Sequence, residues 1–326
     1  MFPWIKKGFP AVILAPMEGV TDASMRAVLT RRHPFQHCVS EFIRVTDQVP
    51  PRKVFVRHIP ELDEGGKTHC GTPIQVQLLG GDVKVMVDAA QYAIQIGFTA
   101  IDLNFGCPAP TVNRHDGGAT LLKYPSRLYQ IVKTIRDCIP MKYPVSAKLR
   151  LGWEDPKDIF VNAKKIEEAG ASWMTIHART RMQGYQPPVF WDIVGEVNRT
   201  SSIPVVANGD IRTKEDFLKC RELSGCEHYM VGRGALGNLG LVSEMVELLG
   251  LARPEVLKSN SLKEKPEWKP LLDDYLHWVN RYEPMNTNTV GRIKQWVKFA
   301  SLSEKISWFD EIKTKKTLSD ILSVFG

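Results

Sequence analysis

Short apolar runs recur along the first two thirds of the chain, and segments with helical periodicity separate them. The runs cover residues 12–17, 37–45, 74–79, 100–103, 145–151, 173–177, 205–207 and 229–232. Several are nearly continuous in apolar residues, as is typical of parallel strands covered on both faces. Eight such strand–helix units in about 240 residues predict an α/β fold of the (β/α)8 TIM-barrel type, which has that size and that number of units.

The strand pattern stops after Leu239, and the rest of the chain predicts a second, smaller domain. Residues 253–270 are rich in Lys, Glu, Pro and Ser, which favours a linker. Two apolar helical stripes follow: Leu271, Leu272, Tyr275, Leu276 and Val279, then Ile293, Trp296, Val297 and Ala300. We therefore expect a barrel domain over 1–242 and a small all-helical domain over 243–326.

Composition and charge narrow the class of protein. With 326 residues, 43% hydrophobic and 24% charged, the chain has the composition of an ordinary soluble globular protein. Its six cysteines form no Cys-x-x-Cys pair, which argues against a structural zinc site and a disulfide framework and favours the reducing cytoplasm. We find no signal-peptide core and no apolar stretch of membrane-spanning length. The net charge of +7 favours a polyanionic partner such as nucleic acid.

The most informative stretch is Asn104-Phe105-Gly106-Cys107-Pro108, which follows the fourth apolar run. Gly and Pro end the strand in a tight turn, and catalytic groups of parallel α/β barrels gather where strands end. Cys107 is therefore a candidate acid or nucleophile. Taken alone, the turn also allows a structural interpretation, because a single cysteine is commonly a small buried apolar residue.

Two later strand ends are typical of phosphate sites. Asn208, Gly209 and Asp210 follow the seventh run, and Gly232 and Arg233 end or follow the eighth. In βα barrels the loops after these two strands commonly offer backbone N–H groups to a phosphate, and glycine allows its close approach. Either glycine alone could simply turn the chain, but the two together favour phosphate binding.

Three polar side chains lie within apolar runs and need partners there. Gln77, Lys148 and His177 fall on the third, fifth and sixth runs. Buried polar and charged groups are costly unless they are paired. A hydrogen-bonding or anionic cofactor above the strand ends would satisfy all three, although a single histidine is most often a satisfied core residue. At the first strand end, Met17 could contact a flat ring or could merely belong to a connection.

Seven motifs, in order along the chain, together resemble the tRNA-dihydrouridine synthase family. They are Ala-Pro-Met-Glu-Gly-Val-Thr at 15–21, Val-Gln-Leu at 76–78, Asn-Phe-Gly-Cys-Pro at 104–108, Lys-Leu-Arg-Leu-Gly at 148–152, His-Ala-Arg-Thr at 177–180, Asn-Gly-Asp-Ile at 208–211 and Gly-Arg-Gly at 232–234. The segments 40–45, 75–80 and 292–296 are similar to the bacterial C-type subgroup, which modifies uridine 16. One departure is Phe105, where related chains often have a small residue or cysteine.

The resemblance implies an FMN-binding catalytic barrel, a helical tRNA-recognition domain, and NADPH or NADH as reductant. Pro16, Met17 and Glu18 would border the flavin, Gln77 and Lys148 would hydrogen-bond its ring, and His177, Asn208, Gly209, Asp210, Gly232 and Arg233 would serve its phosphate end. Cys107 would be the acid, Asn104 would help hold the uracil, and Arg44 and Arg150 would lie on the substrate side. The resulting expectation is a cytoplasmic monomer that acts on the D-loop of tRNA without a metal or a membrane.

Basic residues in the helical domain predict a surface for RNA phosphates. Arg281, Arg292, Lys294 and Lys298 are opposed only by Glu283 over the same stretch, and we expect Arg292 and Lys294 to bind the substrate. A solvated helix face is the alternative interpretation. Two other functions stay open: an FMN barrel acting on a small molecule, as dihydroorotate dehydrogenase does, and a tRNA-binding protein without turnover.

Overall fold

Eight parallel strands close into a barrel in the computed structural model, which describes residues 5–109, 117–251, 265–282, 288–303, 306 and 308–325. The strands are β1 (Ala11–Leu14), β2 (His37–Arg44), β3 (Ile74–Leu79), β4 (Ile101–Phe105), β5 (Val145–Arg150), β6 (Met174–His177), β7 (Val205–Asn208) and β8 (His228–Val231). Each strand pairs with its neighbour in the sequence, and β8 closes the ring against β1. The predicted TIM barrel is confirmed, and each expected strand is present within a few residues of its predicted bounds.

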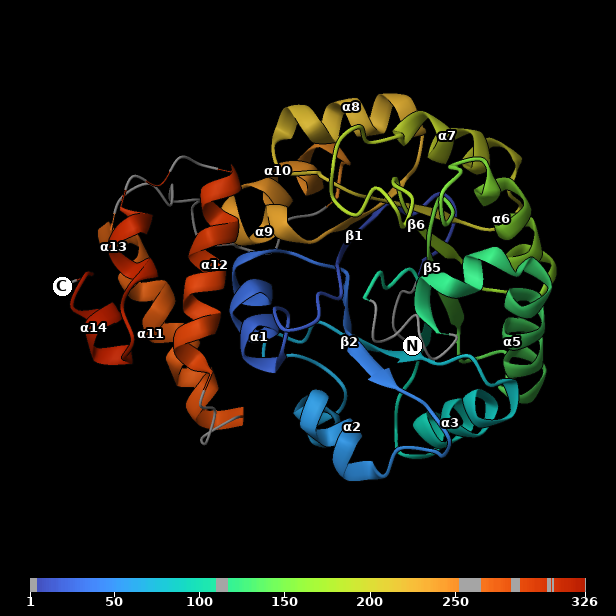
Figure 1. The fold of residues 1–326 in the computed structure, drawn as a ribbon, viewed down its shortest axis with the longest axis horizontal. Coiled ribbons are helices and arrows are strands. Elements are labelled where there is room, and N and C mark those ends of the chain that lie inside the picture. The colour runs from blue at the N-terminus through green and yellow to red at the C-terminus, as the bar shows by residue number, and fades with distance from the viewer. Residues whose placement is uncertain are drawn as a thin grey trace.

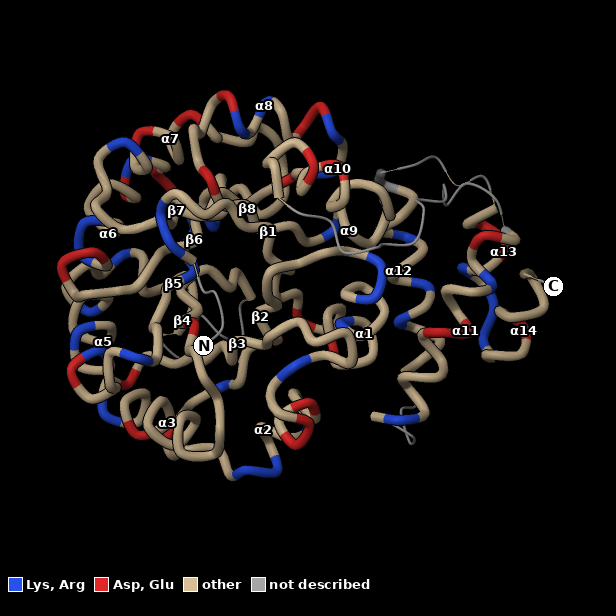
Figure 2. Tube along the Cα trace, turned by 180° about the vertical axis from the view of Figure 1, so that it is seen from behind, with Lys and Arg blue, Asp and Glu red and all other residues tan. Residues whose placement is uncertain are grey.

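Helices surround the barrel as an outer ring (Figure 1). They are α1 (Ala23–Arg32), α2 (Arg52–His58), η1 (Pro60–Glu64), α3 (Val83–Gln95), η2 (Gly118–Lys123), α5 (Pro125–Cys138), α6 (Asp158–Glu168), α7 (Trp191–Thr200), α8 (Lys214–Ser224), α9 (Arg233–Gly237) and α10 (Leu241–Leu248). Capping residues fix several starts: Asp22 accepts from the Met25 N–H at α1, and Thr213 and Asp216 form a capping box at α8. Lys/Arg and Asp/Glu alternate along α5 to α8 in Figure 2, so the net positive charge is not concentrated on this ring.

The inside of the barrel is divided into an apolar half and a polar half. Ile13, Val39, Val206 and Met230, from β1, β2, β7 and β8, belong to an apolar cluster separate from the larger core between strands and helices. The inward side chains of β3, β4 and β5 are polar and hydrogen-bond to one another: Gln75, Gln77, Asp102, Asn104 and Ser146. Strand alternation determines which side chains face the inside of the barrel, but the fold does not require them to be polar. The polar half is therefore a property of this sequence.

In the described part of the C-terminal region, four helices form a lobe beside α1 and α9 (Figure 1). They are α11 (Lys265–Tyr282), α12 (Thr289–Ser303), α13 (Phe309–Lys313) and α14 (Leu318–Leu322). Its core is aromatic: the Trp268 ring meets the Trp296 and Trp308 rings edge-on, with centroids 5.3 and 5.7 Å apart. The Trp296 indole N–H donates to the Leu236 carbonyl of α9 at 3.0 Å, which ties the lobe to the barrel.

Two expected boundaries differ from the structure. Helix α10 runs across the expected division at 242 to 243 and packs on β1 and α8, so it is the last helix of the barrel. Helix α11 begins at Lys265 and so includes the last part of the expected linker at 253–270. Burial of Trp268 stabilises this first part of the helix, and Pro266 lies in the first turn, where proline is tolerated. The linker residues before Lys265 lie outside the described part. No described helix combines the length and the apolar character needed to cross a membrane.

Two histidines close the N-terminal end of the barrel. His37 and His228 begin β2 and β8, which flank β1, and both are buried; the His37 ring lies edge-on to Trp173 at 6.1 Å. Burial, and for His37 also the nearby His228, lowers their pKa values to about 3 and about 4. Both rings are therefore neutral in the folded protein at neutral pH.

This pair should make the fold acid-sensitive. A histidine in the unfolded chain binds a proton near pH 6.5, so the folded state loses stability as pH falls below that value. Between pH 7 and pH 5 each buried histidine should cost about 2 kcal/mol of unfolding free energy. Between pH 7 and pH 5, the unfolding free energy of His37→Gln should therefore fall by about 2 kcal/mol less than that of the wild type. Urea titrations at the two pH values measure this difference. An unchanged pH dependence would mean that His37 is protonated in the folded state.

Candidate active site

A cavity of about 560 Å³ opens at the carboxyl ends of the strands. The predicted site residues that line it are Pro16, Met17, Glu18, Gln77, Asn104, Cys107, Lys148, Arg150, His177, Asn208, Gly209, Asp210, Gly232 and Arg233. The structure thus brings together residues from seven strand ends. Three predicted residues, Arg44, Arg292 and Lys294, are not in its lining.

The Cys107 turn is held by the side chain before it. The Asn104 carbonyl Oδ1 accepts from the backbone N–H groups of Gly106 and Cys107, at 3.0 and 2.9 Å. From β5, the Arg150 Nε donates to the Gly106 carbonyl at 2.9 Å. Burial raises the pKa of the Cys107 thiol, and the backbone N–H of Ala109 acts in the opposite direction. The thiol is therefore protonated at neutral pH and can give up a proton as an acid.

A lysine and a histidine line the next part of the cavity. Lys148 donates to the Asn208 side-chain carbonyl at 3.2 Å, and burial together with the Arg150 charge lowers its pKa to about 8. Burial lowers the pKa of His177 well below 6.5, and the neighbouring cations, first Arg150 and Lys148, lower it further. Its Nδ1 atom has no hydrogen-bond partner within the described part of the chain. A neutral histidine and an ammonium group thus face the cavity together.

Beyond them, one carboxylate gathers three guanidinium groups. Asp210 pairs with Arg179 at 2.6 Å, Arg212 at 3.0 Å and Arg233 at 2.5 Å. Although burial raises it, the pKa of Asp210 is lowered overall by the Arg179 hydrogen bond and the surrounding charges. Asp210 therefore orients the arginines, and its place at the phosphate end of the flavin stays a prediction. The cluster carries two positive charges in excess.

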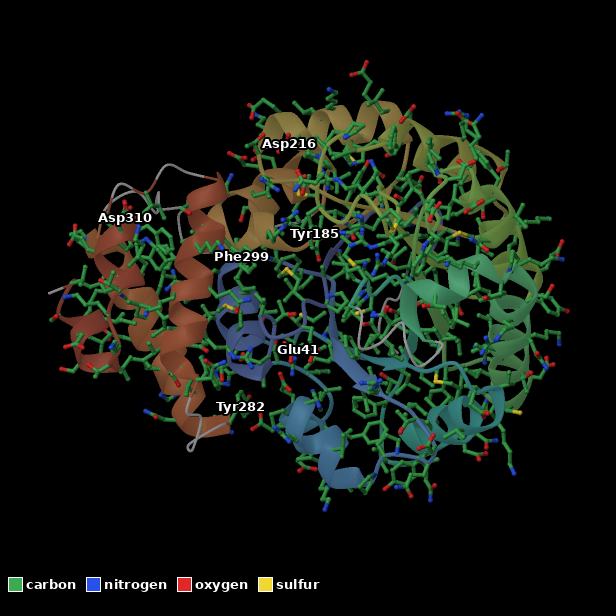
Figure 3. All side chains as sticks on the ribbon, in the orientation of Figure 1. Glu41, Tyr185, Asp216, Tyr282, Phe299 and Asp310 are labelled. Carbon is green, nitrogen blue, oxygen red and sulfur yellow. The ribbon has the colours of Figure 1, made fainter. Side chains whose placement is uncertain are left out.

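Among the lining residues that were not predicted from the sequence, four have larger side chains: Phe42, Tyr185, Gln295 and Phe299. Tyr185 lies below the Arg233 guanidinium, whose carbon is 4.5 Å from its ring centroid. Figure 3 shows Phe299 on the side of α12 that faces the barrel. Gln295 and Phe299 are four residues apart, so they share one face of α12. That spacing was available in the sequence, but only the neighbouring buried stripe was recognised.

Arg292 joins the two domains. Its Nη1 lies 2.9 Å from Asp22 Oδ2 and 3.9 Å from Glu41 Oε1, and the Arg292 and Asp22 side chains are only 18% and 7% exposed. Burial and the charges of Glu18 and Asp22 raise the pKa of Glu41 to about 7. Arg292 thus faces the barrel and offsets an acidic cluster. The prediction that it contacts RNA phosphate has no support from this geometry.

The other two predicted substrate residues lie elsewhere. Lys294 donates to the Lys313 carbonyl at 3.0 Å, which turns it towards α13. Arg44 is exposed at the end of β2. Of the basic residues expected on this surface, Arg281 pairs with Glu64 of η1 at 2.7 Å.

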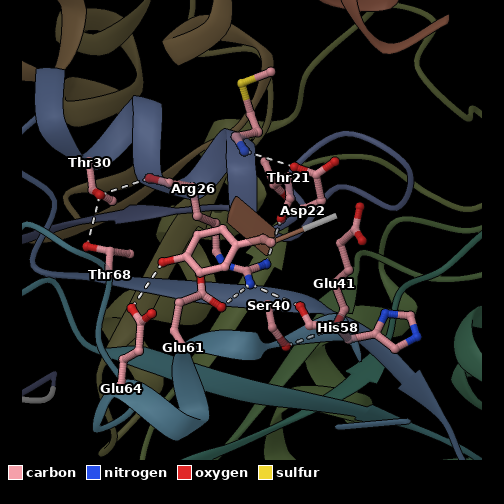
Figure 4. A network of polar contacts seen from close by, with 12 residues as sticks. Thr21, Asp22, Arg26, Thr30, Ser40, Glu41, His58, Glu61, Glu64 and Thr68 are labelled. Atoms are coloured by element: carbon pink, nitrogen blue, oxygen red, sulfur yellow. Dashed lines mark hydrogen bonds and ion pairs between the residues drawn. The ribbon is translucent and has the colours of Figure 1, made fainter. Parts of the chain in front are cut away.

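A buried ion pair supports the connection after β1. Arg26 donates to Glu61 through Nε and Nη2, at 3.0 and 2.7 Å, and through Nη1 to the Thr21 carbonyl at 2.9 Å. Figure 4 shows this pair with Asp22 and Glu41 near it. Both Arg26 and Glu61 are fully buried, so loss of either would leave an unpaired charge. The pair holds the loop that carries Met17 and Glu18 against the cavity.

Comparison with known proteins decides the family. The profile described as dihydrouridine synthase (Dus) matches residues 13–297. The chain belongs to the dihydrouridine synthase family. A relative from Vibrio vulnificus is 48% identical over 319 residues and covers 95% of each chain; one from Shewanella oneidensis is 40% identical over 323 residues and covers 96% of each. Both are named tRNA-dihydrouridine(16) synthase.

A solved structure shares the barrel. The old yellow enzyme homologue from Zymomonas mobilis aligns with a TM-score of 0.50 and 14% identity, over 74% of this chain and 90% of that chain. At this level of identity the likeness shows the fold alone.

The cavity of this dihydrouridine synthase fits a flavin nucleotide. Its volume lies within the range of about 300–1,000 Å³ usual for cofactor sites. A smaller hollow of about 20 Å³ between the loops after β7 and β8 is lined by Gly209, Gly232 and Arg233 among others, where the excess positive charge suits a phosphate. Gly209 has φ +124°, and a Cβ at Gly232 would lie 3.0 Å from the Met17 sulfur, so side chains are disfavoured at both. Within the described ranges, no three His, Cys, Asp or Glu side chains form a group that could hold a metal.

The Arg292 contact predicts unequal effects for two neighbouring cations. Arg292→Met should lower the unfolding free energy by about 1–3 kcal/mol, because it leaves Asp22 and Glu41 without their cation. Lys294→Met, on the same helix, should change it by less than about 0.5 kcal/mol, because the contact of Lys294 with the Lys313 carbonyl is exposed. Chemical unfolding of both variants checks this. Equal effects would contradict the domain-joining role.

Proposed function

We propose that this protein reduces a uridine in the D-loop of tRNA, at position 16, to 5,6-dihydrouridine. Relatives named tRNA-dihydrouridine(16) synthase match nearly its whole length, helical domain included. The observation that carries the chemistry is the position of Cys107 in the wall of a cavity suited to a flavin, where burial raises the pKa of its thiol. A cytoplasmic monomer completes the proposal, in keeping with six cysteines that are all free.

The cofactor in this proposal is FMN, with NADPH or NADH as the reductant. When bound, FMN supplies the hydride that uracil accepts at C6. Lys148 and Gln77 would hold its ring, and Pro16 and Met17 would border it. His177, Asn208 and the glycines 209 and 232 would hold the ribityl phosphate, whose charge Arg233 offsets.

Cys107 supplies the second hydrogen of the reduction. As hydride reaches C6, the S–H bond breaks and its proton forms the new C–H bond at C5, which leaves a thiolate. The thiolate then recovers a proton from solvent. A thiol with a raised pKa suits this step, because it is fully protonated before the reaction. Asn104 fixes the turn, and Arg150 donates to its Gly106 carbonyl, so both hold the donor in place.

The target base must leave its stack to reach Cys107, and a tRNA loop makes this step less costly. Tyr185 and Phe299 provide aromatic faces at the rim, one from the barrel and one from α12. A small-molecule FMN barrel would have no use for a wall supplied by a separate helical lobe. A binding protein without turnover would have no use for a thiol in the wall of a cavity of cofactor size.

Substitution of the thiol tests the catalytic assignment. Cys107→Ala should keep bound flavin and its reduction by NADPH but should lose dihydrouridine formation by at least about a hundredfold, since proton transfer contributes about 10²–10⁴. Flavin absorbance and mass spectrometry of the tRNA measure the two steps. Cys138→Ala, at an exposed cysteine of α5, is the matched control. Full dihydrouridine output from Cys107→Ala would remove Cys107 from the mechanism.

Cells without the protein test the position on tRNA. Their tRNA should lack dihydrouridine at position 16 and retain it elsewhere, because one active site presents one base to Cys107. Position-resolved mapping of dihydrouridine in deleted and complemented strains measures this. Loss at another position would keep the family reaction and reject the assignment to uridine 16.

A further inference from the structure

A carboxylate in the middle of the barrel has no part in the site described so far. Asp102 lies on β4, two residues before Asn104, and is 1% exposed. Its Oδ2 accepts from Gln77 Nε2 at 2.7 Å, and its Oδ1 accepts from the Ser146 hydroxyl. A buried carboxylate is costly, so its retention here needs an explanation.

The contacts continue in one direction from Asp102 to the cysteine turn. Gln77 gives its N–H to Asp102, so its carbonyl Oε1 is left to accept from Asn104 Nδ2 at 2.8 Å. Asn104 in turn has its carbonyl Oδ1 left for the backbone N–H groups of Gly106 and Cys107. Both ends of this chain are fixed, because a carboxylate only accepts and a backbone N–H only donates.

Residue 102 must accept hydrogen bonds on both sides. Gln75 Nε2 donates to the Ile101 carbonyl and to the Ser146 hydroxyl oxygen, both at 2.9 Å. Ser146 therefore directs its own proton to residue 102, while Gln77 approaches from the other side. Only an ionised carboxylate can accept from both donors. An asparagine at position 102 whose carbonyl accepted from Ser146 would direct its amide N–H to Gln77. Donor and acceptor would then be exchanged in each hydrogen bond from residue 102 through Gln77 to Asn104.

We propose that Asp102 is a positioning residue that sets the donor–acceptor direction of the Gln77–Asn104 chain and thereby holds the Cys107 turn. The reversed chain would bring the Asn104 amide donors against the backbone N–H groups of Gly106 and Cys107, which would lose both hydrogen bonds. Asp102 also lies near Lys148, whose charge favours the ionised carboxylate. Burial raises the pKa of Asp102 to about 6, so it is ionised at neutral pH.

The test compares Asp102→Asn, Ser146→Ala and the double variant with the full-length wild type. Asp102→Asn keeps the size of the side chain but gives it a donor. Ser146→Ala alone leaves the Asp102–Gln77 contact intact and serves as the control. In the double variant no hydroxyl competes for the asparagine carbonyl, which can then accept from Gln77 and restore the original direction.

Cysteine labelling measures the turn without any cofactor or RNA. Iodoacetamide labelling at Cys107 is compared by peptide mass spectrometry with labelling at the exposed Cys138 in the same molecule. A loosened turn exposes the thiol, so the Cys107 to Cys138 ratio should rise by about threefold or more in Asp102→Asn. It should stay near the wild-type value in Ser146→Ala and return towards it in the double variant.

Turnover measures the consequence for catalysis and rests on the proposed function. In Asp102→Asn, kcat for tRNA should fall by about tenfold to a hundredfold with KM little changed, because the proton donor is misplaced while the RNA surface is intact. Ser146→Ala should keep kcat near the wild-type value, and the double variant should recover most of the loss. A wild-type protein that forms no dihydrouridine would reject the proposed function and leave the labelling test valid.

Two labelling results would overturn the positioning role. One is a wild-type ratio in Asp102→Asn, which would show that residue 102 need not be a pure acceptor. The other is an equal increase in Asp102→Asn and in the double variant, which would show that the negative charge matters and the direction of the chain does not.

Discussion

The requirement that buried polar groups find partners governs this structure. One half of the barrel interior is apolar and packs conventionally. The other half carries two glutamines, an aspartate, an asparagine and a serine, which hydrogen-bond to one another in one connected set. Such a set is costly when incomplete and rigid when complete. Here it ends at the backbone of the turn that presents Cys107, so the packing of the barrel centre and the chemistry at its rim depend on each other.

The helical lobe is part of the same site. Its tryptophan core anchors it to α9, and Arg292 ties it to the acidic residues around the first strand end. These contacts put Gln295 and Phe299 in the wall of the cavity. The helical domain thus also shapes the cavity.

Much of this arrangement could be predicted from the sequence. Periodicity alone indicated the eight strands, and the polar residues Gln77, Lys148 and His177 within them indicated a site at the strand ends. The predictions of a flavin cofactor and a uracil substrate came from the family resemblance, because hydrophobic periodicity carries no information about ligands.

What the sequence could not predict was the pairing of charged side chains. From the sequence, Arg292 is predicted to be a basic surface residue, but the fold pairs it with Asp22. Asp210 is predicted to be a cofactor ligand, and the fold also pairs it with three arginines. Except for Asp210 with Arg212, these pairings arise between residues that lie in or next to different strands and helices. The start of α11 also differed, because the buried ring of Trp268 outweighs the polar composition around it.

The most direct test of the account is a reaction with purified components. The protein, its flavin content measured by absorbance, is mixed with unmodified tRNA and NADPH, and dihydrouridine is located by mass spectrometry. The account predicts a flavin-containing protein that forms one dihydrouridine per tRNA, at position 16. Bound flavin that NADPH reduces, with no dihydrouridine in the tRNA, would contradict it.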